Sequence, residues 1–204
     1  MGDNRLPLSF YQSLDTISLA RALLGCELVH DSPDGSTSGI IVETEAYLCD
    51  DPACHAFNRR TARTEPMYRT PGTIYVYLIY GMYQCINVVS NQEGIGEAVL
   101  IRALQPLRGI ALMQQRRMLS RKVNYDLQKP FSVRDLCRGP GKLVQAMGIE
   151  RTYHNNKSFI EGNLYITEGI EEKKEITVSP RIGINVGIDL PYRFSIKGSL
   201  YVSK

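Results

Sequence analysis

The pattern of apolar and polar residues in the first third of the chain predicts one helix and two antiparallel strands. Residues 14–29 open with an Asp and a Thr that can cap a helix, continue with apolar residues at helical spacing, and end in a strand-like run. The polar residues 31–38 contain an Asp-Gly pair typical of a hairpin turn, so 39–48 is expected to be the second strand. Residues 49–72 are polar, basic and rich in proline, which predicts a long loop of the kind that often carries function.

A second hairpin is predicted over residues 73–89, which are rich in aromatic and β-branched residues and have Gly81 near the middle as a natural turn. A strand at 98–104 and a helix from about 106 to 122 are expected next. A shorter helix is expected after the Gly-Pro-Gly of 139–141, where proline suits the first helical turn.

From about residue 158 the sequence alternates short strands and turns. No repeat, low-complexity tract or linker divides the chain, so residues 1–204 are expected to form one domain. The expected fold class is α+β, with a mostly antiparallel sheet, flanking helices and a protruding β-hairpin. A chain of 204 residues, 43% of them apolar, is long enough to bury a core without a metal or disulfide.

Composition favours a cytoplasmic protein. The chain has no run of about 18 apolar residues that could span a membrane, and its first residues lack the apolar centre of a secretory signal. The five cysteines are odd in number and form no Cys-x-x-Cys pair, so we expect reduced thiols. Cys49, Cys54 and His55 are close in sequence but lack the second ligand cluster of a zinc site, so no metal is expected.

Positive charge is concentrated in the middle of the chain. The net charge is only +3, yet residues 59–142 carry 14 Lys and Arg against 5 Asp and Glu, whereas residues 1–58 carry 2 against 9. A basic face of this kind can bind a nucleic-acid backbone, although a solvated basic helix gives the same pattern. Arg138 and Lys142 lie at the start of the predicted short helix, where they could contact a phosphate or simply belong to a helix cap.

Two acidic residues and a tyrosine alternate along the predicted strand 39–48. Because side chains alternate in a strand, Glu43, Glu45 and Tyr47 are expected on one face. A solvent-facing polar face would explain them, and so would a carboxylate beside an aromatic wall that serves as a general base. The two acids could also suggest a sugar-cleaving pair, but such pairs usually sit farther apart on separate elements.

Large apolar residues surround the predicted turn at Gly81, where Asn, Asp or Ser would be ordinary. A buried hairpin tip is one explanation. The other is a wedge that separates base steps from the minor groove, with further tyrosines on which a base can stack. Together with the basic middle of the chain, the second explanation indicates an enzyme that extracts a base from DNA. The residues concerned are Tyr75, Tyr77, Tyr80, Met82 and Tyr83.

Six blocks of sequence, in order along nearly the whole chain, resemble the alkyladenine type of 3-methyladenine DNA glycosylase. The resemblance implies excision of damaged purines from duplex DNA by hydrolysis of the N-glycosidic bond, without metal or organic cofactor. It implies 3-methyladenine and other N-alkylpurines, hypoxanthine and ethenoadenine as substrates, and a monofunctional enzyme without strand-cleaving lyase activity. The blocks are ARALLGCELV (20–29), IVETEAYL (41–48), PGTIYVYLIYGMYQCINVV (71–89), LIRALQPLRG (100–109), LCRGPGKLVQAMGI (136–149) and SPRIGINVG (179–187).

The resemblance also implies the roles of the catalytic and base-binding residues. Glu45 would be the catalytic base, and Arg102 would help to hold the water and the adjacent backbone. Tyr47 would stack on one face of the flipped base, with Tyr77 and His55 around the other.

Three more residues receive roles from the same resemblance. Asn87 would crowd the 2-amino group of guanine and so spare normal guanine. Tyr80 would fill the gap left in the duplex, with Met82 nearby at the wedge. The loop at 56–70 departs from the family pattern, with Thr64 where the family more often has Asn, and this departure bears on substrate range.

Two other functions are compatible with the same residues: hydrolysis of free nucleosides, and binding of damaged or structured nucleic acid without catalysis. An apolar wedge at a hairpin tip has no use in a nucleoside hydrolase, and a pure binder has no use for Glu45. The expected partner is therefore double-stranded DNA containing damaged purines, bound by a monomer that has no membrane attachment and associates with the nucleoid through DNA.

Overall fold

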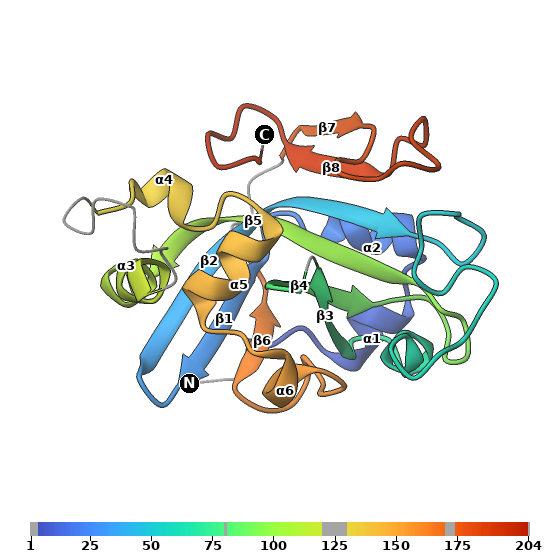
Figure 1. The fold of residues 1–204 in the computed structure, drawn as a ribbon, viewed down its shortest axis with the longest axis horizontal. Coiled ribbons are helices and arrows are strands. Elements are labelled where there is room, and N and C mark those ends of the chain that lie inside the picture. Colours follow the sequence, from blue (N-terminus) through green and yellow to red (C-terminus); the bar gives the residue numbers. More distant parts are fainter. Residues whose placement is uncertain (1–3, 80, 120–129, 170–173, 204) are drawn as a thin grey trace.

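An antiparallel sheet of eight strands forms the centre of the molecule (Figure 1). The structure is a computed structural model that describes residues 4–79, 81–119, 130–169 and 174–203. The main path of the sheet runs β3-β4-β5-β2-β1-β6, while β8 pairs with β2 and β7 pairs with β8. Every paired strand is antiparallel to its neighbour, which confirms the expected α+β class. The strands are β1 (Glu27–Ser32), β2 (Gly35–Tyr47), β3 (Ile74–Ile79), β4 (Tyr83–Val89), β5 (Ala98–Arg108), β6 (Leu164–Thr167), β7 (Ile176–Ser179) and β8 (Arg193–Ile196).

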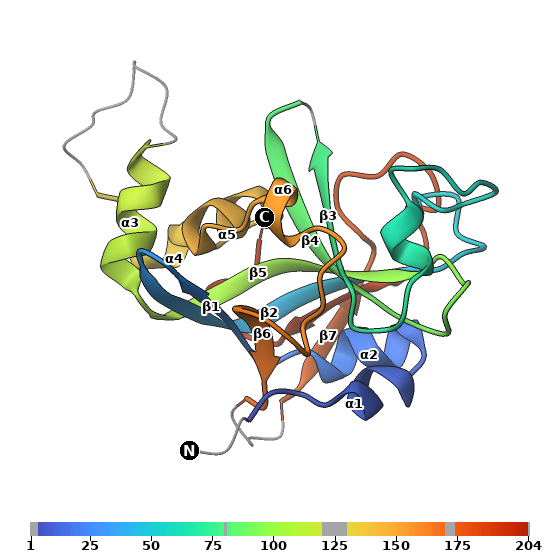
Figure 2. The ribbon, with the colours of Figure 1, turned by 90° about the horizontal axis from the view of Figure 1, so that it is seen from below.

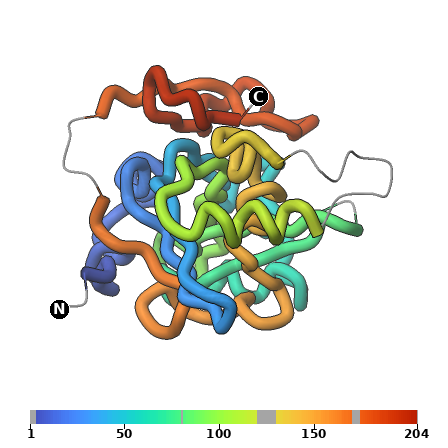
Figure 3. The backbone as a smooth tube through the Cα atoms, turned by 90° about the vertical axis from the view of Figure 1, so that its left-hand side faces the viewer, coloured from blue at the N-terminus to red at the C-terminus, as the bar shows by residue number. Residues whose placement is uncertain are grey.

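Strand β2 organises the sheet because it pairs with three neighbours. It lies along β5, pairs with β1 through its first half, and pairs with β8 at Glu43–Glu45. Its register against β5 shifts on both sides of Glu43, and such bulges bend a strand and redirect its side chains. Because β8 pairs with β2 and β7 pairs with β8, the C-terminal β7–β8 pair lies along one side of the sheet, as Figures 1 and 3 show.

Helices cover both faces of this sheet (Figure 2). Asp15 caps α2 by accepting a hydrogen bond from the Ser18 backbone N–H at 2.8 Å, as the sequence predicts. With both faces covered, residues 37–46 of β2 are all buried instead of alternating with solvent-facing positions. The helices are α1 (Leu8–Gln12), α2 (Thr16–Ala22), α3 (Ile110–Leu119), α4 (Val133–Leu136), α5 (Pro140–Met147) and α6 (Arg151–His154), with a 3-10 turn η1 (Glu65–Tyr68).

Two of the expected boundaries are wrong. The helix expected from about 106 begins at Ile110, because Pro106 belongs to β5, where it pairs with Gly39 at a register shift that tolerates a residue without an N–H. The end of that helix, at 120–122, lies outside the described residues. The turn expected over 31–38 is shorter, because β1 continues to Ser32 and β2 already starts at Gly35.

The β3–β4 hairpin projects from the body of the molecule, as predicted (Figure 2). Gly81 in its turn has a φ of +70°, a conformation that favours glycine. Met82 beside it is 57% exposed, which excludes a buried hairpin tip at this position. Tyr80, the expected wedge, lies outside the described residues.

The five cysteines are all free thiols, as expected. Of the helices in the described part of the chain, none combines the length and the apolar character that crossing a membrane requires.

Candidate active site

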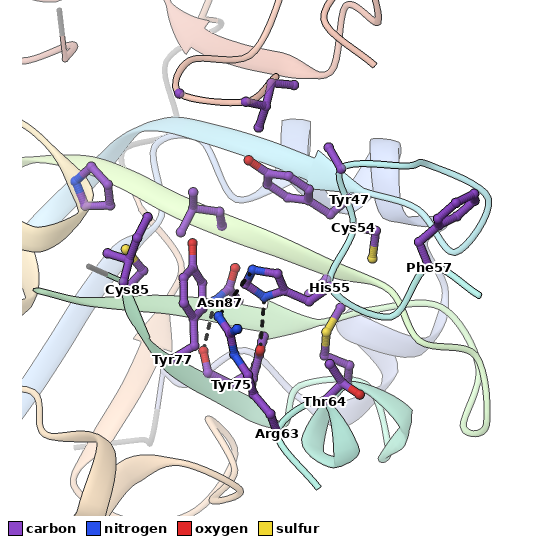
Figure 4. A pocket seen from close by; sticks show the side chains of 18 of the residues that line it. Tyr47, Cys54, His55, Phe57, Arg63, Thr64, Tyr75, Tyr77, Cys85 and Asn87 are labelled. Carbon is purple, nitrogen blue, oxygen red and sulfur yellow. Dashed lines mark hydrogen bonds between the residues drawn. The ribbon is translucent and has the colours of Figure 1, made fainter. Parts of the chain in front are cut away.

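One cavity of about 720 Å³ brings together five of the residues to which the family resemblance assigned catalytic or base-binding roles (Figure 4). It lies between the end of β2, the β3–β4 hairpin, the loop after β2 and the segment 182–186 near the C-terminus. Residues far apart in the sequence meet here because β2, β4 and β5 are neighbours in the sheet. The five residues are Tyr47, His55, Tyr77, Asn87 and Arg102.

Glu45 lies immediately behind the wall of this cavity, fully buried and held by three donors. Its Oε2 accepts hydrogen bonds from the Tyr47 hydroxyl at 2.8 Å and from Arg102 Nη1 at 3.1 Å. Its Oε1 accepts one from the Ile182 backbone N–H at 2.9 Å. A buried carboxylate with a cation and two further donors is fixed in orientation, and all three donors belong to residues that line the cavity.

Glu43, the other acid of the pair, holds neighbouring segments of the chain together. It is also fully buried, and its Oε1 accepts from Arg193 Nε at 2.6 Å and from Arg102 Nε at 3.2 Å. Its Oε2 accepts from the Ser203 backbone N–H at 2.6 Å. Glu43 therefore joins β2 to the C-terminal strands and holds the side of Arg102 that faces away from Glu45. The interpretation of both acids as a solvent-facing surface is wrong.

Arg102 bridges the two acids. Burial alone would lower the pKa of its guanidinium, but the carboxylates of Glu45 and Glu43 outweigh burial and raise the pKa. Arg102 Nη1 also donates to the Ile182 backbone oxygen at 3.4 Å. The side chain is consequently fixed between β2 and the C-terminal segment, with one face on the cavity.

Aromatic rings form the walls of the cavity. His55 packs edge-on against Tyr77 with ring centroids 4.5 Å apart, and His55 Nδ1 lies 3.0 Å from the Tyr75 hydroxyl. Burial, with a contribution from the charge of Arg63, lowers the pKa of His55 to about 4, so the imidazole is neutral near pH 7. Burial and the nearby Glu45 raise the pKa of Tyr47, whose hydroxyl stays protonated and donates to that carboxylate.

The other predicted residues lie in the wall of the cavity, beside it or outside it. Asn87 is buried in the wall, and its Nδ2 donates to the Tyr75 backbone oxygen at 3.0 Å. Lys142 is exposed in the first turn of α5, whose Pro140 lines the cavity. Arg138 instead donates from Nε to the Val202 backbone oxygen at 2.7 Å, which ties it to the C-terminal segment.

Two arginines beside the aromatic walls were not singled out from the sequence. Arg181 forms a buried ion pair with Asp51, and its guanidinium lies 4.6 Å from the Tyr47 ring centroid. The guanidinium of Arg63 lies 5.5 Å from the Tyr77 ring centroid. Arg181 lies in the block 179–187 that resembles the family, and this is the sequence signal that could have drawn attention to it. Arg63 has no such signal beyond its place in a long basic loop.

Among the described residues, no three side chains of His, Cys, Asp and Glu converge in a way that could hold a metal ion. Cys49, Cys54 and His55 thus form no cluster despite their closeness in sequence. The imidazole of His55 is engaged by the Tyr75 hydroxyl and by Arg63 instead.

Comparison with known proteins agrees with this geometry. The family model described as methylpurine-DNA glycosylase matches residues 9–200. A protein of Methanoculleus marisnigri is 44% identical over 203 residues, covering 98% of each chain, and one of Carboxydothermus hydrogenoformans is 44% identical over 200 residues with the same coverage. A protein of Clostridium acetobutylicum is 46% identical over 205 residues, covering 98% of this chain and 97% of its own. All three are assigned as 3-methyladenine DNA glycosylases. The chain therefore belongs to the methylpurine-DNA glycosylase family.

Proposed function

We propose that the protein is a monofunctional DNA glycosylase that excises alkylated or deaminated purines from duplex DNA. The substrates would be of the 3-methyladenine type, with hypoxanthine and ethenoadenine as neutral substrates. The observation that carries this proposal is the fixed carboxylate of Glu45 behind a deep cavity with aromatic walls. Such a cavity suits a flat base that has been rotated out of the duplex.

In the proposed reaction, water attacks C1′ of the sugar while the bond from C1′ to the purine nitrogen breaks. The electron pair of that bond leaves with the purine, and Glu45 accepts a proton from the water. Before the proton moves, the carboxylate also stabilises the positive charge that develops on the sugar. Glu45 has no exposed surface, and the three residues that donate to it, Tyr47, Arg102 and Ile182, line the cavity. The attacking water is therefore proposed to bind at this part of the wall.

The charge of the leaving base decides whether the enzyme must also supply a proton to it. A purine alkylated at N3 or N7 is cationic and departs as a neutral molecule without help. A neutral base such as hypoxanthine needs a proton at departure. The described wall offers His55, whose pKa of about 4 keeps it neutral, and tyrosines whose raised pKa makes them weak acids. The reaction is therefore expected to be slower with neutral bases unless the base itself is bound more favourably.

Tyr47 and Tyr77 supply faces on which the extruded base can stack, and such stacking contributes about 1–3 kcal/mol per base. Met82, exposed at the tip of the projecting hairpin, is suited to contact the gap left in the duplex. Action as a monomer is part of the same proposal.

The absence of lyase activity is also part of the proposal. Lyase chemistry by a side chain needs an amine that forms a Schiff base with the sugar. The described residues that line the cavity include three arginines, one histidine and three tyrosines but no lysine. Water, rather than an amine, is therefore the proposed nucleophile.

A gel assay tests the proposal. Purified protein is incubated with duplexes that carry one 7-methylguanine, one hypoxanthine or no lesion, and strand breaks are measured before and after alkali. Breaks that appear only after alkali, and only at the lesion, are expected. Breaks before alkali would contradict the absence of lyase activity, and binding without breaks in either condition would favour a non-catalytic binder.

A further inference from the structure

Arg63 places a positive charge at the mouth of the base-binding cavity. It belongs to the loop between β2 and η1, lines the cavity, and donates from Nη2 toward His55 Nε2 at 3.5 Å. Its guanidinium carbon lies 5.5 Å from the centroid of the Tyr77 ring. In Figure 4 Arg63 reaches in from the loop and lies beside Tyr75, Tyr77 and His55.

The charge of Arg63 differs from that of Arg102, which also lines the cavity, and from that of Arg181, which lies against the Tyr47 ring. Arg102 is neutralised by Glu43 and Glu45, and Arg181 by Asp51. No carboxylate among the described residues lies within salt-bridge distance of Arg63. Glu65, two residues further along the chain at the start of η1, is engaged by Arg60 at 2.6 Å.

Any base that stacks in this cavity meets two opposing influences. Electron-rich aromatic faces favour a cationic base by about 0.5–2 kcal/mol. A guanidinium at the same ring already occupies that interaction and repels a second positive charge across a few ångströms. A neutral purine avoids the repulsion, and its ring nitrogens and carbonyl oxygen can accept hydrogen bonds from a guanidinium.

We infer that Arg63 is a specificity-determining residue that shifts excision toward neutral damaged purines and away from cationic alkylpurines. This inference rests on the proposed glycosylase function and deepens it. The pKa of His55 shows how Arg63 acts on a neighbouring positive charge. Burial lowers this pKa most, and the charge of Arg63 lowers it further. The charge of Arg63 disfavours a cationic purine beside it, just as it adds to the effect of burial in disfavouring a protonated His55.

The test compares single-turnover excision of 7-methylguanine, which is cationic, with excision of hypoxanthine, which is neutral. The variants are Arg63→Gln, which removes the charge, and Arg63→Lys, which keeps it. Arg69→Gln is the matched control, because Arg69 is a nearby exposed arginine just after η1 that contacts Glu65 at 3.8 Å and does not line the cavity. Spontaneous loss of 7-methylguanine is subtracted with an enzyme-free duplex.

Arg63→Gln is expected to raise the ratio of 7-methylguanine to hypoxanthine excision by about tenfold, the size expected for one charge about 6 Å away in partly screened surroundings. Arg63→Lys and Arg69→Gln should leave the ratio near that of the wild type. If the wild type excises only one of the lesions, Arg63→Gln should gain or accelerate 7-methylguanine excision while Arg69→Gln does not.

Equal slowing of both lesions by Arg63→Gln would overturn the inference, because it would indicate a phosphate contact instead of discrimination. A ratio for Arg63→Lys equal to that for Arg63→Gln would also overturn it, since the charge would then be irrelevant. If the wild-type protein excises neither lesion, the proposed glycosylase function itself is contradicted. That outcome is seen with the wild type alone, so it is distinguishable from failure of the inference about Arg63.

Discussion

Glu43→Gln is expected to lower the free energy of unfolding by about 3 kcal/mol, the lower end of the 3–5 kcal/mol that removal of one partner of a buried ion pair costs. The substitution removes a fully buried charge with almost no change in side-chain volume. Arg193 loses the carboxylate 2.6 Å from its Nε, and the remaining charge stays partly buried. Arg102 keeps Glu45 at 3.1 Å, which is why the lower end of the range applies.

Urea unfolding at pH 7 measures this loss, with Glu27→Gln as the matched control. Glu27 pairs with Arg108 at 2.7 Å, but the Arg108 side chain is 56% exposed, and exposed pairs contribute about 0–1 kcal/mol. For a chain of this size a loss of 3 kcal/mol corresponds to a Tm about 6–12 °C lower. An unfolding free energy for Glu43→Gln within about 1 kcal/mol of that for Glu27→Gln would refute the reasoning.

Three further outcomes are expected. Asn87→Ala should increase release of guanine from undamaged duplexes, because it removes the side chain proposed to crowd the 2-amino group; unchanged release would count against that role. Met82→Ala should weaken binding to lesion-containing duplexes without changing Tm, since Met82 is 57% exposed, and a large fall in Tm would contradict its placement. The unfolding free energy should fall as pH decreases from 6.5 to 5: burial lowers the pKa of all three histidines, so the unfolded chain binds protons that the native protein does not. A urea midpoint that is constant over this range would contradict the buried, neutral state of His30 and His154.

Elements with a local signal were predictable from the sequence. The Asp15 cap of α2, the glycine turn of the β3–β4 hairpin and the proline start of α5 are set by residues close to one another in the chain. The short helices α4 and α6 have only four residues each and were not predicted, since so short a segment has no apolar periodicity. The start of α3 was misplaced because pairing with β2, which no local pattern reveals, extends β5 through Pro106.

The site likewise combines features set by neighbouring residues, which were predictable, with features set by distant parts of the chain, which were not. Alternation along β2 correctly placed Glu43, Glu45 and Tyr47 on one face, but it could not show that one acid faces the cavity wall and the other the C-terminal strands. That division depends on Arg102, Arg193 and Ser203, which come from distant parts of the chain. The position of Arg63 depends likewise on how a long loop folds over the sheet.

The most direct test of the central claim is the single-turnover rate of base release by Glu45→Gln with a duplex that carries one 7-methylguanine. The substitution keeps the size of the side chain and a hydrogen-bond acceptor for Arg102, but it cannot take a proton from water. Lesion binding is expected to persist while the rate falls at least about 100-fold, as for the loss of a general base. A variant that binds the lesion and releases the base at the rate of the wild type would contradict the assignment of Glu45 as the catalytic base.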